Sequence, residues 1–281
     1  MSNELKNGYD IIGDVHGHAA KLEGLLSQLG YKIQDDVWFH ESRSVVFLGD
    51  LVDYGPQQLE TVAIVRRMQK AGTAQVIMGN HEFNAIAWFN GWREKNQKNY
   101  EQHEPFLKAI VGQPRLHAEI IEWFQTLPIW LEVPEHGVRF VHACWDSGIV
   151  EGLHGPLWTT EQLKAGATKP ETGQKRNAFH HASEVLLKAP EDETFLVEDH
   201  HGVPRGTRIE WWRNYEGSEL VFFGHYRMTQ KSSFITSPRA LCLDYSDKSG
   251  KSPLVAYRFD FSDTNFSDEK IVTFPLLSLG L

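Results

Sequence analysis

Short apolar runs alternate with amphipathic stretches in the first part of the chain. Residues 9–14, 44–50 and 74–80 are mostly apolar, and each run ends with a glycine and then a polar residue. Between them, residues 19–31 and 56–72 carry apolar side chains at helical spacing. Strands that alternate with helices pair in parallel and are covered on both faces, so this pattern predicts an α/β fold.

The stretch 83–127 shows a helical pattern that is rich in aromatic and polar residues. We predict a helical excursion over the sheet, with breaks at Gly91, Pro105 and Pro114, because glycine and proline interrupt helices. The pattern leaves open whether this excursion is a lid over a binding site, a partner surface or part of the core.

Strand character returns in the second half of the chain. Residues 138–145 and 219–225 are apolar runs that each contain a histidine near the end. Residues 239–246 and 254–261 have strand character and are expected to form a closing antiparallel pair.

One long stretch, residues 155–215, lacks a regular pattern. We predict an irregular insertion there, with a helix near residues 178–188. No repeat of fixed period occurs. The whole chain, residues 1–281, is expected to form a single domain with these two excursions.

The composition narrows the class of protein. A hydrophobic content of 41% with 23% charged residues is ordinary for a globular protein, and a net charge of −9 argues against a nucleic-acid surface. Cys144 and Cys242 lie in apolar runs, which indicates buried free thiols in a reducing compartment. Without a secretory signal or a membrane-length apolar run, we expect a cytoplasmic protein with no membrane partner. The sequence does not indicate an oligomeric state.

Polar side chains follow five of the apolar runs at the point where each predicted strand ends. Ligands bind beyond the carboxyl ends of strands in α/β sheets, so these side chains are expected to converge on one crevice. They are Asp14, His16, Asp50, Asn80, His142 and His225.

Oxygen and imidazole ligands without thiolates suit Mn, Fe or Zn in a catalytic site better than a structural zinc site. Six protein ligands exceed the needs of one open metal, so a carboxylate shared between two ions is expected. Taken singly, each feature has a simpler explanation: a turn acid, a core histidine, or a helix cap in the Asn80 segment. The five endings together favour the metal site.

The motifs "GDVHG", "GDLVDYG", "GNHE", "VHA" and a late "GH" resemble those of the calcineurin-like metallophosphoesterase superfamily, over roughly residues 9–258. Their order and spacing are most similar to its phosphoprotein phosphatase branch, which includes diadenosine tetraphosphatases, and look bacterial in type. The resemblance implies a two-sheet α/β sandwich flanked by helices, with a dinuclear metal site at the carboxyl ends of the strands.

The resemblance also implies roles for individual residues. Asp14 and His16 would hold the first metal ion, and Asp50 would bridge both ions. The second ion would be held by Asn80, His142 and His225. A hydroxide that bridges the metals would attack phosphorus, while His81, oriented by Asp53, protonates the leaving oxygen. Two manganese ions are the expected cofactors, with iron or zinc as alternatives.

One position departs from the family pattern. "GDxVDRG" has a phosphate-binding arginine where this chain has Tyr54, and a neutral hydroxyl cannot replace a guanidinium fork. We expect Tyr54 and nearby arginines to contact substrate, and the candidates are Arg205, Arg208, Arg213 and Arg227.

Three functions are considered. The first, and the expected one, is hydrolysis of phosphate monoesters, as in phosphoprotein phosphatases. The second is symmetrical hydrolysis of dinucleoside tetraphosphates, which the tail "ALCLDYSDKSGKSPLVAYRF" resembles. The third is a non-catalytic metal-binding scaffold, which the presence of every catalytic residue of the motifs disfavours. A phosphorylated protein or nucleotide is therefore the expected partner.

Overall fold

The computed structural model describes residues 6–170, 175–198, 204–229 and 233–274. Its larger sheet has the strand order β13–β12–β1–β4–β5. The strands are β1 (Gly8–Ile12), β4 (Arg43–Phe47), β5 (Ala74–Val76), β12 (Leu254–Asp260) and β13 (Ile271–Phe274). β1, β4 and β5 run parallel, as their alternation with helices predicts, whereas β12 and β13 are antiparallel to their neighbours.

The second sheet has the strand order β11–β10–β7–β6. Its strands are β6 (Trp130–Val133), β7 (Val138–Val141), β10 (Leu220–Phe223) and β11 (Ala240–Cys242). β7, β10 and β11 are parallel, and β6 is the antiparallel edge. Two hairpins stand apart from both sheets: β2 (Lys32–Gln34) with β3 (Val37–Phe39), and β8 (Glu191–Glu198) with β9 (Pro204–Arg208).

The two sheets pack face to face, and successive residues of each strand point to opposite layers. Ile11 of β1 and Phe140 of β7 belong to the cluster between the sheets, whereas the next residues, Ile12 and Val141, belong to the cluster shared with the helices. Because side chains alternate along a strand, both faces of each sheet are buried. Each phenylalanine in such a core contributes about 1.5–3 kcal/mol of burial.

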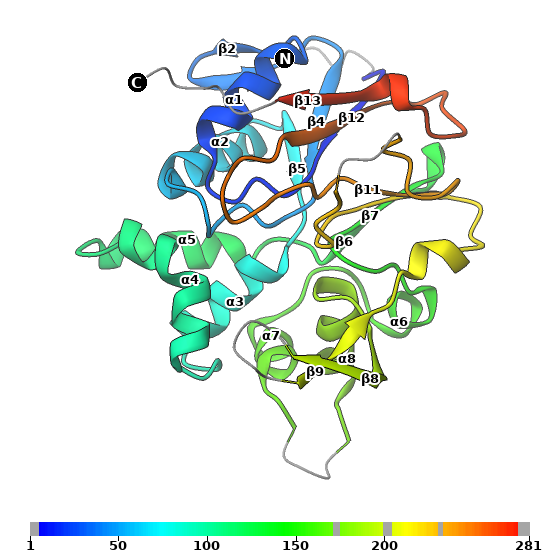
Figure 1. Cartoon of the computed structure of the whole chain (residues 1–281). Coiled ribbons are helices and arrows are strands. Elements are labelled where there is room, and N and C mark those ends of the chain that lie inside the picture. The colour runs from blue at the N-terminus through cyan, green and yellow to red at the C-terminus, as the bar shows by residue number, and fades with distance from the viewer. Residues whose placement is uncertain (1–5, 171–174, 199–203, 230–232, 275–281) are drawn as a thin grey trace.

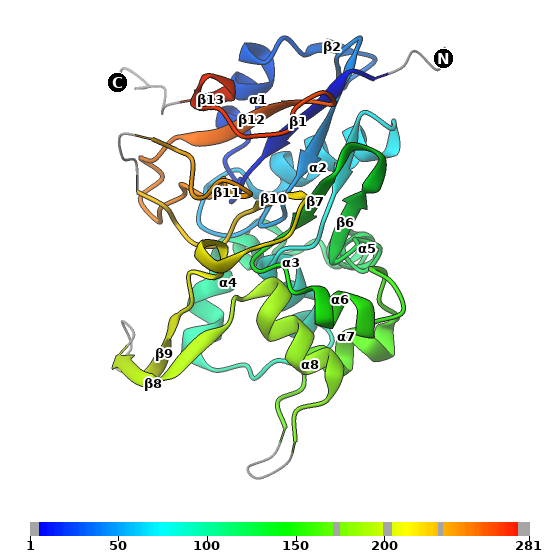
Figure 2. The same ribbon diagram turned by 90° about the vertical axis from the view of Figure 1, so that its right-hand side faces the viewer.

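Helices occupy two places. α1 (Ala19–Gln28) and α2 (Gln58–Lys70) lie against the larger sheet, which matches the amphipathic stretches in the sequence. A second group lies beyond the ends of the strands, in the lower half of Figures 1 and 2. Its members are α3 (Asn80–Phe89), α4 (Gln97–Ala109), α5 (Pro114–Phe124), α6 (Ser147–Gly152), α7 (Thr160–Ala167) and α8 (Ala178–Ala182). In the described part of the chain, no helix has the length and apolar character that crossing a membrane requires.

The predicted closing pair of strands is wrong. β11 lies in the second sheet beside β10, and β12 lies in the larger sheet between β1 and β13. Residues 243–253 separate them, and this connection is long enough to cross from one sheet to the other, whereas hairpin loops usually have about 2–5 residues.

The predicted excursion at 83–127 is helical, but it lies at the strand ends and not over the sheet (Figure 1). Gly91 follows α3 and Pro114 begins α5, as expected. Pro105 does not break α4, which includes this proline in its interior and continues to Ala109.

The predicted insertion at 155–215 is more regular than expected, because it includes α7 and the β8–β9 hairpin as well as the predicted helix near 178–188. Its residues 171–174 and 199–203 lie outside the described residues. The extent of a single domain over 1–281 stays a prediction.

Candidate metal centre

Five strands deliver polar side chains to one place. Asp14 follows β1, Asp50 follows β4, Asn80 follows β5 and begins α3, His142 follows β7, and His225 follows β10. All five side chains are at least nine-tenths buried. Both sheets therefore contribute to the centre, which lies between their ends and the lower helices.

Asp50 is at the middle of the arrangement. Its Oδ1 lies 3.3 Å from His142 Nε2, and its Oδ2 lies 3.6 Å from His16 Nε2. His16 Nε2 also lies 3.9 Å from Asp14 Oδ2. One carboxylate thus faces a histidine on each side, which is the geometry that a ligand shared between two cations requires.

The second half of the centre converges on an amide oxygen. Asn80 Oδ1 lies 2.6 Å from His225 Nδ1 and 3.0 Å from His142 Nε2. His225 and His142 also group with Asp50 as atoms close enough to hold one ion, and His16, Asp50 and His81 form a second such group. Both groups contain Asp50.

Two observations fit this centre to metal ions. His16 and His142 present Nδ1 to the carbonyl oxygens of Val52 (2.9 Å) and Leu48 (2.7 Å), which leaves each Nε2 with a lone pair for a cation. Asp14 Oδ1 is buried and has no hydrogen-bond partner among the described residues. A buried carboxylate oxygen without a partner is costly, and a cation removes that cost.

The electrostatics of Asp14 agree with a metal site at this position. Burial raises the pKa of Asp14 well above its ordinary value, and the nearby carboxylates of Asp244 and Asp50 raise it further. Crowded acids of this kind stay ionised when a cation lies between them. Asp244 is a contributor that the sequence did not reveal; it is buried and lies beside the centre.

The backbone is strained around this site. His16, Asp50 and His225 have φ values of 46°, 50° and 70°, in the left-handed region that side chains other than glycine avoid. Such conformations concentrate at functional sites, where the surrounding packing holds them. A Cβ on Gly224 would lie 2.1 Å from Asp14 Oδ1, so only glycine allows His225 and Asp14 to approach each other.

Glu82 is a second residue that the sequence analysis missed. Its carboxylate is fully buried and accepts hydrogen bonds from the N–H groups of Asp50 (2.8 Å), Leu51 (2.8 Å) and Gly79 (3.0 Å). It ties the end of β4 to the start of α3 and so fixes the backbone of Asp50. The sequence signal for this role is the glutamate of "GNHE", which lies three residues after the helix cap Gly79.

His81 and Asp53 form the predicted pair. His81 Nδ1 donates to Asp53 Oδ2 at 2.5 Å, and His81 Nε2 points toward the centre, 3.9 Å from Asp50 Oδ2. Burial lowers the pKa of His81, but Asp50 and Asp53 outweigh burial and leave it raised. Burial raises the pKa of Asp53, yet His103 and His81 bring it down to about 2.

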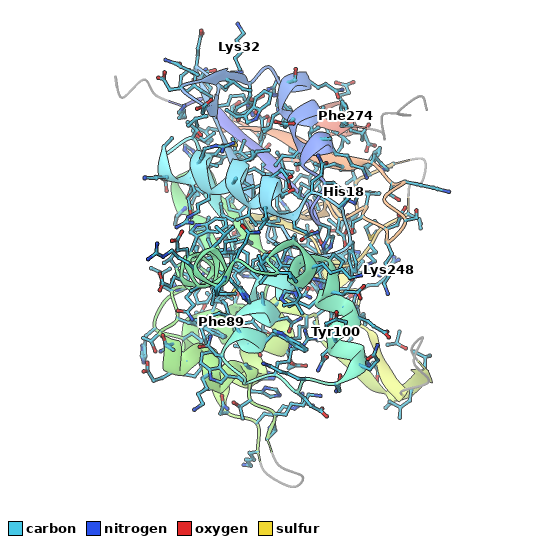
Figure 3. All side chains as sticks on the ribbon, turned by 90° about the vertical axis from the view of Figure 1, so that its left-hand side faces the viewer. His18, Lys32, Phe89, Tyr100, Lys248 and Phe274 are labelled. Carbon is cyan, nitrogen blue, oxygen red and sulfur yellow. The ribbon has the colours of Figure 1, made fainter. Side chains whose placement is uncertain are left out.

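A cavity of about 410 Å³ opens beside the centre. Besides the candidate metal ligands, it is lined by Tyr54, His81, Asp244, Glu101, Gln102 and four cationic side chains, Lys98, Arg208, Arg227 and Lys248. Figure 3 shows Lys248 and, below it, Tyr100 of α4 on the same side of the molecule.

The predicted substrate-binding arginines separate into different environments. Arg208 and Arg227 line the cavity; Arg208 Nη1 donates to the His225 carbonyl at 3.1 Å, and Arg227 hydrogen-bonds the Tyr54 hydroxyl. Arg213 lies elsewhere, because it is exposed, pairs with Glu210 and does not line the cavity. Arg205 belongs to β9.

A buried crevice between two sheets, in which one carboxylate is shared by two groups of residues that could each hold a metal ion, is typical of metal-dependent hydrolases. The profile of the family described as calcineurin-like phosphoesterase matches residues 9–226, and the chain belongs to this family. It is therefore a metallophosphoesterase, as the motifs predict.

Two similar proteins are named as bis(5'-nucleosyl)-tetraphosphatases, which agrees with hydrolysis of a phosphoester or phosphoanhydride. An asymmetrical bis(5'-nucleosyl)-tetraphosphatase PrpE of Oceanobacillus iheyensis is 32% identical over 219 residues, 77% of this chain and 76% of that protein. A symmetrical bis(5'-nucleosyl)-tetraphosphatase of Psychromonas ingrahamii is 28% identical over 170 residues, 60% of this chain and 52% of that protein.

Solved structures support the fold. A cold-active protein-tyrosine phosphatase of a psychrophilic Shewanella species superposes with a TM-score of 0.55 and 17% identity, over 98% of this chain and 82% of that one. This likeness shows that the two-sheet sandwich with its flanking helices is the fold of other phosphatases.

Proposed function

We propose that this protein hydrolyses dinucleoside polyphosphates at the Asp50 centre. The observation that carries this proposal is the cavity beside the centre, where Lys98, Arg208, Arg227 and Lys248 surround a space far larger than one phosphate group. The chain is acidic as a whole, with a net charge of −9, so four cationic side chains at one cavity, beside the carboxylates of the centre and Glu101, are a local feature suited to a polyanion that binds near metal ions. The names of its relatives support the same substrate class.

The centre is proposed to hold two metal ions. Asp14 and His16 would hold one ion, Asn80, His142 and His225 the other, and Asp50 both. When bound, divalent ions lower the pKa of water and neutralise charge on the phosphoryl group. We propose manganese, with iron and zinc as alternatives for the same ligands. A cytoplasmic location fits the two cysteines, which are both free and buried.

His81 is proposed to give a proton to the leaving oxygen. The pKa of His81 is raised because Asp50 and Asp53 outweigh its burial, which favours the protonated imidazole, and Nδ1 is occupied by Asp53, so the proton available for transfer is the one on Nε2. A nucleotide phosphate or an alcohol leaves more easily when it is protonated as the bond breaks.

Arg227 and Tyr54 are proposed to replace the family's phosphate-binding arginine. The Arg227 guanidinium lies 5.0 Å from the Tyr54 ring centroid and hydrogen-bonds its hydroxyl. Tyr54 therefore still has a guanidinium beside it, which belongs to Arg227, two residues after His225. Arg208, which is held by the His225 carbonyl, provides a second cation.

Arg227→Gln is expected to lower kcat/KM by roughly 10- to 150-fold, the worth of one charge-assisted hydrogen bond. Arg213→Gln is the matched control, because Arg213 pairs with Glu210 outside the cavity; it should leave kcat/KM unchanged. Steady-state kinetics on diadenosine tetraphosphate provide the measurement. Equal kcat/KM values for both variants would remove Arg227 from substrate binding.

The substrate class is tested by comparing kcat/KM for diadenosine tetraphosphate, a phosphoserine peptide and 4-nitrophenyl phosphate, each with manganese. We expect diadenosine tetraphosphate to exceed the others by at least about tenfold, equal to about 1.4 kcal/mol of transition-state binding. The products identify the cleaved bond: two ADP molecules from symmetrical cleavage, AMP and ATP from asymmetrical cleavage. Preference for the peptide would replace the proposal with phosphoprotein phosphatase activity, and no turnover with metal bound would favour a scaffold.

A further inference from the structure

We propose that His103 is a positioning residue that holds Asp53 in the orientation His81 needs. His103 belongs to α4 and is fully buried, and its Nδ1 lies 3.0 Å from Asp53 Oδ1. The other oxygen of Asp53, Oδ2, accepts the hydrogen bond from His81 Nδ1. The inference rests on the proposed function, because it assigns His103 to the proton-transfer step of that reaction.

The carboxylate of Asp53 needs a second contact to stay in one plane. The terminal torsion of an aspartate side chain is broad, so a hydrogen bond to one oxygen does not fix the rotation of the group. His103 and His81 approach different oxygens from different helices, α4 and α3, and together they define that plane. The Asp53 N–H is also held, by Gln58 Oε1 at 2.7 Å, which fixes the backbone under it.

Apart from its contact with Asp53, the His103 imidazole makes no hydrogen bond among the described residues. A carboxylate only accepts hydrogen bonds, so Nδ1 carries the proton. Nε2 is buried and has no hydrogen-bond partner among the described residues. The ring packs against Trp88 and Phe106, with centroids 6.3 and 5.1 Å away. An aliphatic side chain would fill this space without the cost of burying Nε2, so the N–H toward Asp53 is what the imidazole adds.

The position of His103 on α4 links the proton donor to the substrate cavity. Residues Lys98, Glu101 and Gln102 of the same helix line the cavity, and His103 is the next residue. The helix that forms this wall therefore also supplies the contact that orients Asp53. Arg93 Nη2 donates to Gln102 Oε1 at 2.6 Å and secures the helix at this point.

The test compares substrates that differ in their need for a proton. His103→Leu keeps the bulk and removes the donor, and the manganese-loaded protein is assayed on phenyl phosphate and on 2,4-dinitrophenyl phosphate. We expect kcat on phenyl phosphate, whose leaving group is poor, to fall about tenfold, because a well-placed general acid contributes about 10²–10⁴-fold. The kcat for the dinitrophenyl ester should change by less than about twofold, because that leaving group departs without a proton.

Two further variants separate positioning from packing. His103→Asn carries an amide N–H on the same branch as Nδ1 and should recover most of the phenyl phosphate rate. His117→Leu changes a partly buried histidine that contacts the same Phe106 ring but, among the described residues, makes no hydrogen bond to Asp53, and it should leave the ratio of the two rates unchanged. Thermal unfolding and metal content are measured for every variant.

The outcomes distinguish this inference from the proposed function. If the wild-type protein is active and folded His103→Leu keeps the same ratio of the two rates, the positioning role is overturned and the proposed function stands. An equal fall on both esters, or loss of metal, would also overturn it, because either result shows a general structural role. Absence of wild-type turnover on every phosphate substrate would overturn the proposed function itself.

Discussion

Asp50→Asn is expected to reduce the bound metal from two ions per chain to one or none and to lower activity by more than about 100-fold. Replacing a residue that only orients a ligand costs about 10–100-fold in metal affinity, so loss of a shared ligand should cost more. An amide has one acceptor oxygen, whereas Asp50 directs Oδ1 toward His142 and Oδ2 toward His16. The neutral side chain also leaves less negative charge for two cations.

Asparagine is chosen because it tolerates the left-handed backbone that Asp50 adopts, so the substitution tests charge and not strain. Asp35→Asn is the matched control: Asp35 also has a φ of 50°, but it is exposed in the turn between β2 and β3. Metal content after dialysis, measured by mass spectrometry, and turnover of 4-nitrophenyl phosphate are the two readouts. Two ions retained at wild-type affinity would show that Asp50 does not bridge them.

The ligand residues could be predicted because their signal is local. Asp14, Asp50 and Asn80 each follow a glycine that ends an apolar run, and strand ends of a parallel sheet meet at one edge. Together with His142 and His225, which also follow apolar runs, they give five strand ends, which suffice to place a crevice without knowing any distance. The geometry of that crevice agrees with the prediction, whereas the catalytic and ligand roles stay predictions until the substitutions are made.

The supporting residues could not be predicted because their signal is not local. His103 contacts Asp53 across 50 positions of the chain, from a polar stretch with no motif of its own. Asp244 and Lys248 reach the site only because residues 243–253 cross between the sheets. The same crossing explains why the prediction that β11 pairs with β12 is wrong: both segments are strands, as expected, and only tertiary packing assigns them to different sheets.

His81→Ala is expected to lower kcat on phenyl phosphate by about 100-fold or more while both metal ions remain bound, since general acid catalysis contributes about 10²–10⁴-fold. The loss should be much smaller on 2,4-dinitrophenyl phosphate. The pH dependence follows from the raised pKa of His81: the imidazole is protonated below that pKa and loses its proton as pH rises through it. The wild-type rate on phenyl phosphate should therefore fall on the alkaline side, and His81→Ala should lack that fall.

Metal content decides between the two roles that the geometry allows His81. His16, Asp50 and His81 lie close enough to hold an ion, so His81 is also placed as a ligand. However, its Nδ1 is committed to Asp53, and its backbone N–H donates to Asp50 Oδ1 at 2.9 Å, which holds the ring beside the centre as a donor. Loss of an ion in His81→Ala, but not in the exposed control His154→Ala, would make His81 a ligand. Retention of both ions with the selective loss on phenyl phosphate would identify it as the acid.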